Sequence, residues 1–331
     1  IPPDISLPIP SKVCPFRVDL SLFNNRLRMT ADYYRKKTTD LLNNVEMPRS
    51  SGYTTALRNI GSIRNSGFEL QLDGRIIDRA VKWDLGVNFS LNRSKVLVLS
   101  EDKDIFGGEL DNTILKDQLN LMRVGEPMYV FYGYVEDGYD ENGHIVYKNM
   151  DDDPAITAAD KTIIGDPNPD FLVNLTTAVS YKGFTLSAFF QSSIGNDIYS
   201  LSMAAQAYDY GYNGNTLREV YYNHWTPENP TAKYPNLDQT SYKMSDRFVY
   251  DGSFVRLKNL ELAYDVPCAR SKFIKRARVY VSAQNLFTIT SYPFWDPDIN
   301  ANGGGSSMIQ GVDSYCYPSA RTYTIGCRLT F

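Results

Sequence analysis

Apolar and polar side chains alternate along much of this chain of 331 residues, and this alternation is its strongest structural signal. In segment 83–92, Trp83 and Leu85 begin an apolar face that every second residue continues, while Asp, Gly, Asn and Ser fill the other positions. Segment 322–331 follows the same pattern up to Phe331. Because successive side chains of a β-strand point to opposite faces, this period predicts strands with one apolar and one polar side. No stretch has the period of a long amphipathic helix, so we predict an all-β fold.

The connections between the predicted strands alternate in length. Short turns are expected at Asn24-Asn25, at residues 77–80 and at Lys182-Gly183. A transmembrane antiparallel β-barrel has this asymmetry, with short periplasmic turns and long external loops, and roughly nine to eleven spanning strands fit the chain. The long connections are rich in Tyr, Asn, Asp, Gly and Pro, and they cover about 39–63, 95–170, 196–252 and 291–319.

The direction of each strand follows from this count. Phe331 reaches the periplasmic side only if 95–170 contains an even number of spanning strands, including zero. Residues 128–136 and 144–148 are therefore either structure within the external insert or one extra strand pair. The alternation slips near Lys258 and Asn259, which predicts a β-bulge. The sheet could close alone as a small barrel, or it could be part of a larger barrel whose other strands precede residue 1.

Composition narrows the classes of function. The net charge of −4 lacks the basic excess of a nucleic-acid-binding protein. The two histidines, His144 and His224, have no recognisable Ser or Cys partner for catalysis. The four cysteines form no CxxC pair, and isolated thiols are favoured over a conceivable Cys316–Cys327 bridge. Residues 1–10 do not resemble a signal peptide, and no apolar run of about 20 residues is present, so we expect the true N-terminus to lie upstream.

Six segments resemble the SusC/RagA family of TonB-dependent outer-membrane transporters. Family members are longer and combine a plug domain with a 22-stranded barrel. The resemblance covers about 19–331 and implies that the chain is the C-terminal part of such a barrel, whereas Pro-rich residues 1–18 form an atypical N-terminal segment. The six segments are ADYYRKKTTDLL (31–42), NIGSIRNSGFE (59–69), GDPNPDF (165–171), FVRLKNL (254–260), VSAQNLFT (281–288) and YPSARTYT (317–324).

The resemblance implies a function in the bacterial outer membrane rather than enzymatic activity. It implies import of large nutrients, glycans or peptides, driven by TonB through an N-terminal region that this chain lacks. It also implies a SusD-like surface lipoprotein as a lid, and recognition of the closing strand by the barrel-assembly machinery. The residues that would form this assembly signal beside the membrane lipid are Tyr323, Ile325, Leu329 and Phe331.

Aromatic residues are dense in the connections 196–252 and 291–319. Aromatic faces stack on sugars, and Tyr hydroxyls add hydrogen bonds, so these loops are expected to contact ligand or lid. Any single ring could instead pack the loops together or belong to an interfacial girdle. The candidate residues are Tyr208, Tyr210, Tyr212, Tyr221, Tyr222, Trp225, Tyr292, Phe294, Trp295 and Tyr315.

Segment 149–160 has the ligand spacing of an EF-hand-like calcium loop. Pro154 stands where such loops have Gly, and Asp160 stands where Glu would bind through both oxygens. A calcium site and a solvated acidic turn therefore both remain open. The candidate ligands are Asn149, Asp151, Asp153, Ala155 and Asp160.

Three functions outside this transporter family share features with this sequence. A passive porin of roughly ten strands would share the same strand pattern. A secreted β-rich carbohydrate-binding module would bury the apolar stripes in a dry core instead. Glycosidase carboxylates could be sought at Asp166 and Asp170, or at Asp296 and Asp298, but turn formation explains these Asp-Pro and Pro-Asp stretches better.

Overall fold

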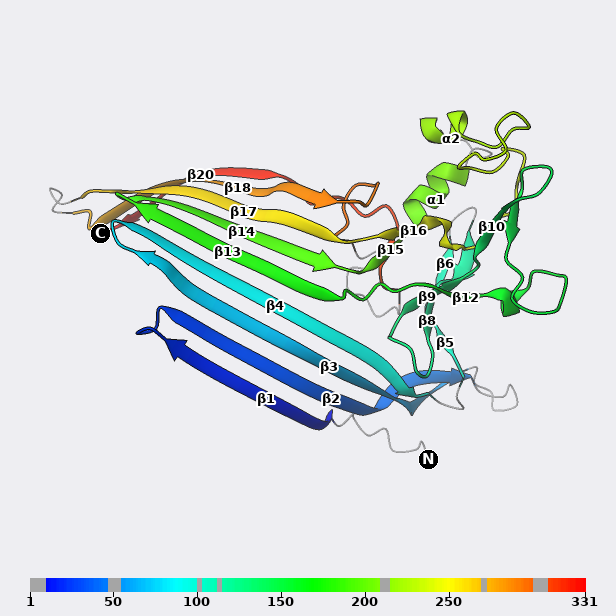
Figure 1. Cartoon of the computed structure of the whole chain (residues 1–331), viewed down its shortest axis with the longest axis horizontal. Coiled ribbons are helices and arrows are strands. Elements are labelled where there is room, and N and C mark those ends of the chain that lie inside the picture. The colour runs from blue at the N-terminus through cyan, green and yellow to red at the C-terminus, as the bar shows by residue number, and fades with distance from the viewer. Residues whose placement is uncertain are drawn as a thin grey trace.

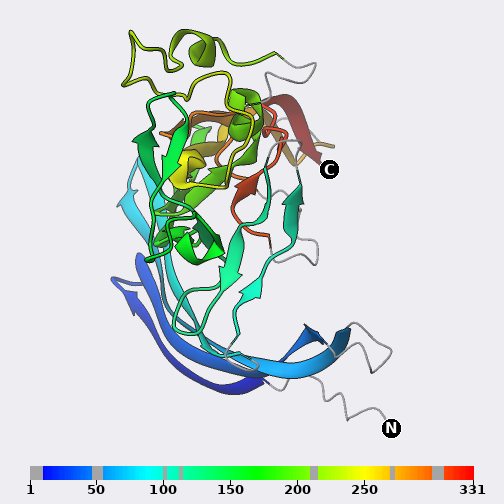
Figure 2. The same ribbon diagram turned by 90° about the vertical axis from the view of Figure 1, so that its right-hand side faces the viewer.

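The largest element of the structure is a curved, nine-stranded antiparallel sheet (Figures 1 and 2). The computed structural model describes residues 10–46, 55–99, 103–111, 115–208, 215–268, 273–299 and 309–331. The strands follow one another across the sheet in chain order, and the sheet is open because β1 and β20 each have one neighbour in the described chain. The strands are β1 (Pro10–Leu22), β2 (Leu27–Glu46), β3 (Thr55–Asp78), β4 (Val81–Val98), β13 (Phe171–Tyr181), β14 (Phe184–Ile194), β17 (Phe254–Val266), β18 (Arg276–Thr290) and β20 (Thr322–Thr330).

Short turns lie at one end of this sheet and long connections at the other, as predicted (Figure 1). Asn24 and Asn25 adopt φ angles of 55° and 64°, a left-handed conformation that Asn tolerates well. Lys182 and Gly183 have φ angles of 48° and 87°, as a two-residue type I′ hairpin requires. The C-terminus lies at the turn end (Figure 1). The predicted strand directions are therefore confirmed.

The two faces of the sheet differ sharply in chemistry. The pairing register aligns an apolar row across eight adjacent strands: Leu20, Met29, Leu72, Val87, Leu175, Phe190, Leu257 and Phe287. On the opposite face the register aligns a polar row: Asp19, Thr30, Gln71, Asn88, Asn174, Gln191, Arg256 and Thr288. A membrane barrel has an apolar outer face and a polar interior, and this wall has both.

The bulge near Lys258 and Asn259 is confirmed. Against β14, the pairing of β17 skips from Leu257 to Asn259, so Lys258 is the extra residue. Against β18, Lys258 faces two residues, Asn285 and Leu286, so the register is irregular on both sides of β17. The predicted loop at 39–63 is wrong in its bounds, because β2 and β3 stay paired out to Glu46 and Thr55. Register shifts after Thr38 interrupt the alternation there and hide the strand ends from a pattern search.

The external connections fold together into one small domain, called here the loop domain, beside the end of the sheet (Figures 1 and 2). It contains no spanning strand among the described residues of 99–170, so 128–136 and 144–148 belong to the external insert. Its strands form sheets in the orders β12-β9-β8-β5 and β16-β15-β19 and the hairpins β10-β11 and β6-β7. Its elements are β5 (Ile105–Phe106), β6 (Glu109–Asp111), β7 (Lys116–Gln118), β8 (Asn120–Met122), β9 (Val130–Gly133), β10 (Glu136–Tyr139), β11 (Ile145–Tyr147), η3 (Ala158–Asp160), β12 (Thr162–Gly165), β15 (Asp197–Ser200), α1 (Leu201–Tyr208), α2 (Arg218–Tyr222), η4 (Asp246–Phe248), β16 (Val249–Asp251) and β19 (Val312–Asp313).

Helix α1 was missed by the sequence analysis. Seven of its eight residues are buried, so it has no polar stripe to mark it as a helix. Its Ala204 and Ala207 pack in a core with Phe131, Phe248 and Val312. The core therefore draws on three external connections that are far apart in the sequence.

The structure also bears on the cysteines, the N-terminal segment and the helices. Cys316 and Cys327 are both thiols, so no disulfide joins them. The division of the chain into an N-terminal segment 1–18 and a barrel segment 19–331 stays a prediction. Strand β1 crosses this boundary without interruption. Among the described residues, no helix combines the length and the hydropathy needed to cross a membrane.

Candidate functional site

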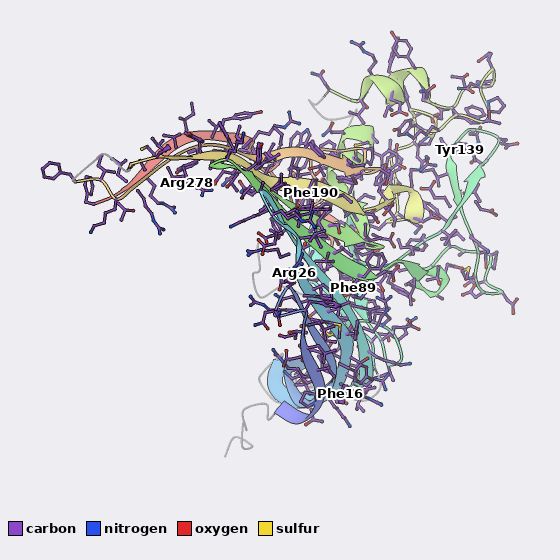
Figure 3. All side chains as sticks on the ribbon, turned by 60° about the vertical axis from the view of Figure 1, so that its left-hand side comes forward. Phe16, Arg26, Phe89, Tyr139, Phe190 and Arg278 are labelled. Atoms are coloured by element: carbon purple, nitrogen blue, oxygen red, sulfur yellow. The ribbon has the colours of Figure 1, made fainter. Side chains whose placement is uncertain are left out.

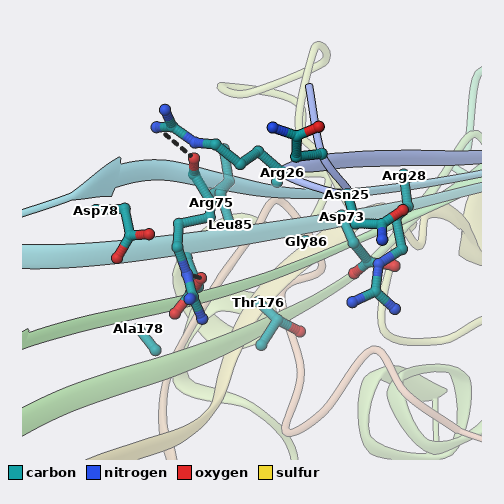
Figure 4. Close-up of a pocket in the computed structure, with 13 residues that line it drawn as sticks. Asn25, Arg26, Arg28, Asp73, Arg75, Asp78, Leu85, Gly86, Thr176 and Ala178 are labelled. Carbon is teal, nitrogen blue, oxygen red and sulfur yellow. Dashed lines mark hydrogen bonds and ion pairs between the residues drawn. The ribbon is translucent and has the colours of Figure 1, made fainter. Parts of the chain in front are cut away.

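The polar face of the wall holds a charged hollow of about 580 Å³ beside the short turns (Figure 4). Arg28, Asp73, Gly86 and Thr176 are successive cross-strand partners that line it. Acidic and basic side chains in this hollow are at least partly exposed. Because charged groups are costly to bury without partners, the hollow must face water or a polar partner. The ionisable lining residues are Arg26, Arg28, Asp73, Arg75, Asp78 and Asp84.

Ion pairs and hydrogen bonds hold this wall in place. The Arg75 guanidinium lies 2.8 Å from the Asp84 carboxylate of the next strand. The Arg26 side chain donates to the carbonyl oxygens of Arg75 and Ile76 across the turn end of the sheet. Figure 3 shows Arg278 of β18 near this end and Tyr139 of the loop domain at the other. The interior face is therefore charged near the turns.

Tyr208, Tyr234 and Tyr292 of the external connections are buried, the first two in the loop-domain core. The Tyr208 ring stacks on Tyr242 with ring centres 3.8 Å apart and meets Phe248 edge-on at 5.1 Å. Tyr234 and Tyr292 are equally buried. The packing alternative therefore describes the observed environment of these rings better than ligand contact does.

Tyr292 also makes a buried polar contact. Its hydroxyl donates to an Asp313 carboxylate oxygen at 2.6 Å and accepts from the Ser200 hydroxyl at 2.8 Å. Burial and the neighbouring carboxylate raise the pKa of Tyr292 well above its ordinary value. The ring therefore stays neutral and ties connection 291–321 to β15.

The remaining candidate rings are exposed or half-buried. Tyr221 and Tyr222 of α2 are 61% and 70% exposed and meet edge-on at 5.2 Å. Trp295 is exposed and stacks on half-buried Phe294 at 4.7 Å, and Tyr315 is also exposed. Half-buried Trp225 packs over the β10–β11 hairpin tip, where Gly143 has a φ of 80° and no room for a side chain. Tyr210 and Tyr212 lie outside the described residues.

The predicted calcium segment forms a chain of local turns. The carboxylates of Asp151 and Asp153 each accept the backbone N–H two residues further along. Asp160 is buried, and its two carboxylate oxygens accept the N–H groups of Met150 and Thr157, both at 2.7 Å. In the described part of the chain, no cluster of three or more His, Cys, Asp or Glu side chains has metal-binding geometry. Calcium binding here stays a prediction that calorimetric titration tests.

Sequence reasoning missed a buried ion pair that fastens connection 291–321 to the wall. Arg256 of the polar row is 1% exposed and binds the Asp296 carboxylate. It also donates to the Thr288 hydroxyl at 2.9 Å and faces the Phe254 ring. A single Arg in an alternating strand carries no sequence signal that identifies a partner 40 residues away.

The Asp296 carboxylate also accepts two backbone hydrogen bonds from the same connection. The backbone N–H groups of Asp298 and Ser319 both donate to it at 2.9 Å. Burial alone would raise the pKa of Asp296, but these N–H groups and Arg256 outweigh burial and lower it. Asp296 is thus an ionised structural anchor, which agrees with the turn role expected for it.

Comparisons with known proteins agree with this geometry. Residues 16–286 match the family model for the TonB dependent receptor-like β-barrel. The chain is 33% identical to TonB-dependent receptor P3 of Formosa agariphila, over 97% of this chain and 34% of that protein. It is 29% identical to TonB-dependent receptor SusC of Bacteroides thetaiotaomicron, over 95% of this chain and 31% of that protein.

Solved structures give the same result. The RagAB peptide importer in its closed-closed state matches with a TM-score of 0.80 and 27% identity, over 96% of this chain and 35% of that one. The chain thus spans about a third of the length of the curated relatives it matches. It belongs to the TonB-dependent receptor-like β-barrel family, whose members lie in the bacterial outer membrane, and it is part of the wall of such a barrel.

Proposed function

We propose that this wall belongs to a SusC-type transporter that imports large nutrients, glycans or peptides, across the outer membrane with energy delivered by TonB. The observation that carries the proposal is the pair of eight-residue rows on the two faces of the sheet, apolar toward lipid and polar toward the interior. A secreted carbohydrate-binding module would not leave Ile325 85% exposed and Val281 52% exposed. The similarity to SusC and to a peptide importer supports the same role.

The open sheet favours a large barrel over a small passive porin. Strands β1 and β20 each carry an unpaired edge in the described chain, which a membrane interior does not tolerate. The two thirds of the relatives' length that this chain does not span is enough to supply further strands and a plug. A plugged barrel needs energy to open, whereas a passive porin does not.

The exposed aromatic rings of the loop domain are proposed to meet ligand or a SusD-like surface lipoprotein. Tyr221 and Tyr222 of α2 form an exposed pair of aromatic rings. Exposed Trp295 forms a second pair, stacked on Phe294. Exposed aromatic rings are common at the centres of protein interfaces. Replacing Tyr221 and Tyr222 together by Ala should reduce co-purification of the lipoprotein, while Tyr33→Ala, on an exposed wall ring, should not.

The closing strand is proposed to carry the signal read by the barrel-assembly machinery. Tyr323, Ile325 and Leu329 alternate along β20 and are exposed, and Phe331 follows at its end. Deleting Phe331 should lower the amount of folded protein in the outer membrane. Replacing Thr330 by Ser, which leaves the apolar face intact, should not.

Uptake by cells tests the transport proposal directly. Cells that carry the full-length protein and its neighbouring lipoprotein should accumulate labelled oligosaccharides or oligopeptides, and loss of TonB should abolish that uptake. Uptake that persists without TonB would mark a passive porin and refute the proposal.

A further inference from the structure

The lipid-facing side of the wall carries a cluster of basic side chains near its external end. On β3, Phe68, Leu70 and Leu72 mark the outward positions, and the same alternation places Arg64 on this side. The residues paired with Arg64 on the two neighbouring strands are also basic. Charge on the lipid face of a barrel is destabilising except near the membrane surfaces, so a cluster there needs a polar environment. The cluster, called here the basic patch, consists of Arg35, Lys37, Arg64, Arg93 and Lys95.

The pairing register brings the cations of the basic patch side by side. Lys37, Arg64 and Lys95 form one row across β2, β3 and β4. Arg35 and Arg93 lie two strands apart in the next outward row toward the turn end. Neighbouring strands are about 4.8 Å apart, and like charges directly opposite each other destabilise a sheet. The arrangement therefore favours an anion that lies between these side chains.

Much of this positive charge is not neutralised by the described part of the chain. The Arg93 guanidinium binds the Asp170 carboxylate at 2.7 Å. The Arg35, Arg64 and Lys95 side chains make no hydrogen bond or ion pair with a described residue. Arg64 is half-buried, whereas Arg35 and Lys95 are exposed. The charge of these three side chains is therefore open to an anionic group from outside the described chain.

The height of the basic patch matches a surface of the membrane. Leu27 begins β2 at the turn end, and Lys37 is ten residues further along the same strand. An antiparallel strand rises about 3.4 Å per residue, and barrel strands tilt by about 35–45°. Lys37 thus stands about 25 Å above Leu27 along the barrel axis, which is about the height of the apolar band of such barrels. The basic patch therefore lies where the lipid head groups begin.

An aromatic row borders the basic patch on its membrane side. Phe16, Tyr33 and Phe68 are neighbours in the pairing register, and all three rings are exposed. Leu91 continues this row on β4. Aromatic side chains are typical of the membrane interface of such barrels. A ligand that covers both the aromatic row and the basic patch needs apolar chains and an anionic head group, and a lipid has both.

Phosphate is the anionic group that suits these side chains best. Guanidinium groups bind phosphate oxygens through paired N–H donors, and a Lys ammonium binds phosphate as a point charge. The outer leaflet of a bacterial outer membrane contains phosphorylated glycolipids, whose phosphates lie at this depth. A second copy of the chain would be a poor occupant, because docking by two-fold symmetry would bring like charges together.

We propose that the basic patch binds the phosphate of an outer-leaflet glycolipid, whose acyl chains lie against the aromatic row. The bound phosphate offsets the repulsion between Arg64 and Lys95 and fixes β2, β3 and β4 in the membrane. The site is separate from any path through the barrel, because it lies on the opposite face of the sheet from the polar row. It depends on the outer-membrane location of the wall and not on the transport function proposed above.

The test measures binding of phosphorylated lipid A to the full-length protein in detergent by native mass spectrometry. The variant Arg64→Gln/Lys95→Gln removes two adjacent cations, and its lipid affinity should fall by about tenfold or more. Arg28→Gln/Lys36→Gln is the matched control, because it removes the same charge from the polar face of β2. Its lipid affinity should equal that of the unaltered protein.

Two further ligands identify what the basic patch recognises. Dephosphorylated lipid A should bind the unaltered protein about tenfold more weakly or less, because the phosphate is the group that the cations hold. Inorganic phosphate at the same concentration as the lipid should leave the lipid bound. Equal affinity for the two forms of lipid A would overturn the proposal and assign the cations to general contact with the membrane surface. Displacement of the lipid by inorganic phosphate would overturn it as well.

Heat-modifiable gel mobility establishes that each variant is folded, and Lys95→Gln alone replaces the double variant if the latter does not fold. Unchanged lipid affinity in the folded variant would refute the site. Equal losses in the patch variant and in the polar-face control would also refute it, because binding would then follow net charge alone. Uptake measurements are independent of this result, so a protein that binds the lipid but imports nothing would refute the transport function alone.

Discussion

The wall and the loop domain use the same apolar residue types in opposite ways. In the wall, apolar side chains point outward, and Ile325, Val281 and Leu262 are at least half exposed. In the loop domain they point inward, and Phe131, Tyr199 and Ala204 are fully buried. Lipid is a solvent for the first set, whereas the second set must escape from water. Exposure of an apolar side chain therefore identifies the solvent that the region meets.

The two regions also differ in how their contacts are distributed along the chain. Every neighbour in the wall is the next spanning strand in the sequence. The loop domain depends on contacts between distant segments, such as Asn120 with the backbone of Gln310 at 3.0 Å and Ser202 with Asp313 at 3.2 Å. The wall is thus locally encoded, and the loop domain is a product of the assembled barrel.

The largest expected difference in stability between the two regions comes from Phe131→Ala. Phe131 is fully buried and meets the Tyr199 ring edge-on at 6.2 Å, so its loss should destabilise the loop domain by about 3–5 kcal/mol. Protease cleavage of the external connections in the full-length protein measures this loss. Phe184→Ala is the control, because Phe184 is 52% exposed on the lipid face and should change cleavage little. Equal cleavage of both variants would contradict the contrast between the regions.

The contact between the regions should be broken by Arg256→Met. The change leaves the buried Asp296 carboxylate without its guanidinium, at a cost of about 3 kcal/mol, because two backbone N–H groups still bind it. Hydrogen exchange of residues 291–299 should rise while exchange in β17 stays slow. Arg93→Met removes a half-exposed ion pair with Asp170 and should cost less than about 1 kcal/mol. A larger effect of Arg93→Met would show that burial does not govern these pairs.

A smaller effect is expected when charge is placed on the wall. Val281→Arg lies between Leu262 and Ile325 on the apolar face, and an Arg there should destabilise the barrel by about 2 kcal/mol. Ser282→Arg, one residue on, turns the same charge to the polar face and should be tolerated. The temperature at which heat-modifiable gel mobility is lost compares the two. If both variants unfold alike, the assignment of lipid and interior faces is wrong.

The sequence predicted the wall well because its rule is local. Alternation marks Trp83 and Leu85 as one face whatever lies beside them, and Asn24-Asn25 and Lys182-Gly183 mark their turns by backbone preference alone. The same rule failed where pairing slips, after Thr38, because a register shift reverses the pattern without ending the strand.

The candidate site was predicted less completely. The many aromatic residues of the external connections indicated a functional region. Whether Tyr208 or Tyr222 is buried or exposed, however, depends on packing between segments that are far apart in the sequence. Helix α1 is buried on all sides, and Arg256 finds Asp296 only in the assembled protein. Such contacts leave no periodic signal, so a local reading cannot separate core rings from exposed ones.

The smallest expected effect is a change in hydrogen exchange that distinguishes two roles for Asp160, a cap of the local turn and a ligand of a bound cation. The N–H groups of Met150 and Thr157 lower the pKa of this carboxyl, so its stabilising contribution is present above the unfolded pKa of about 3.9 and is lost as pH falls through the folded pKa. Hydrogen exchange of 149–160, corrected for intrinsic rates, should therefore rise in acid, and Asp160→Asn should remove that pH dependence. Chelation of calcium at neutral pH should leave protection unchanged if Asp160 only caps the turn. Lost protection after chelation would instead assign the acidic segment to a bound cation.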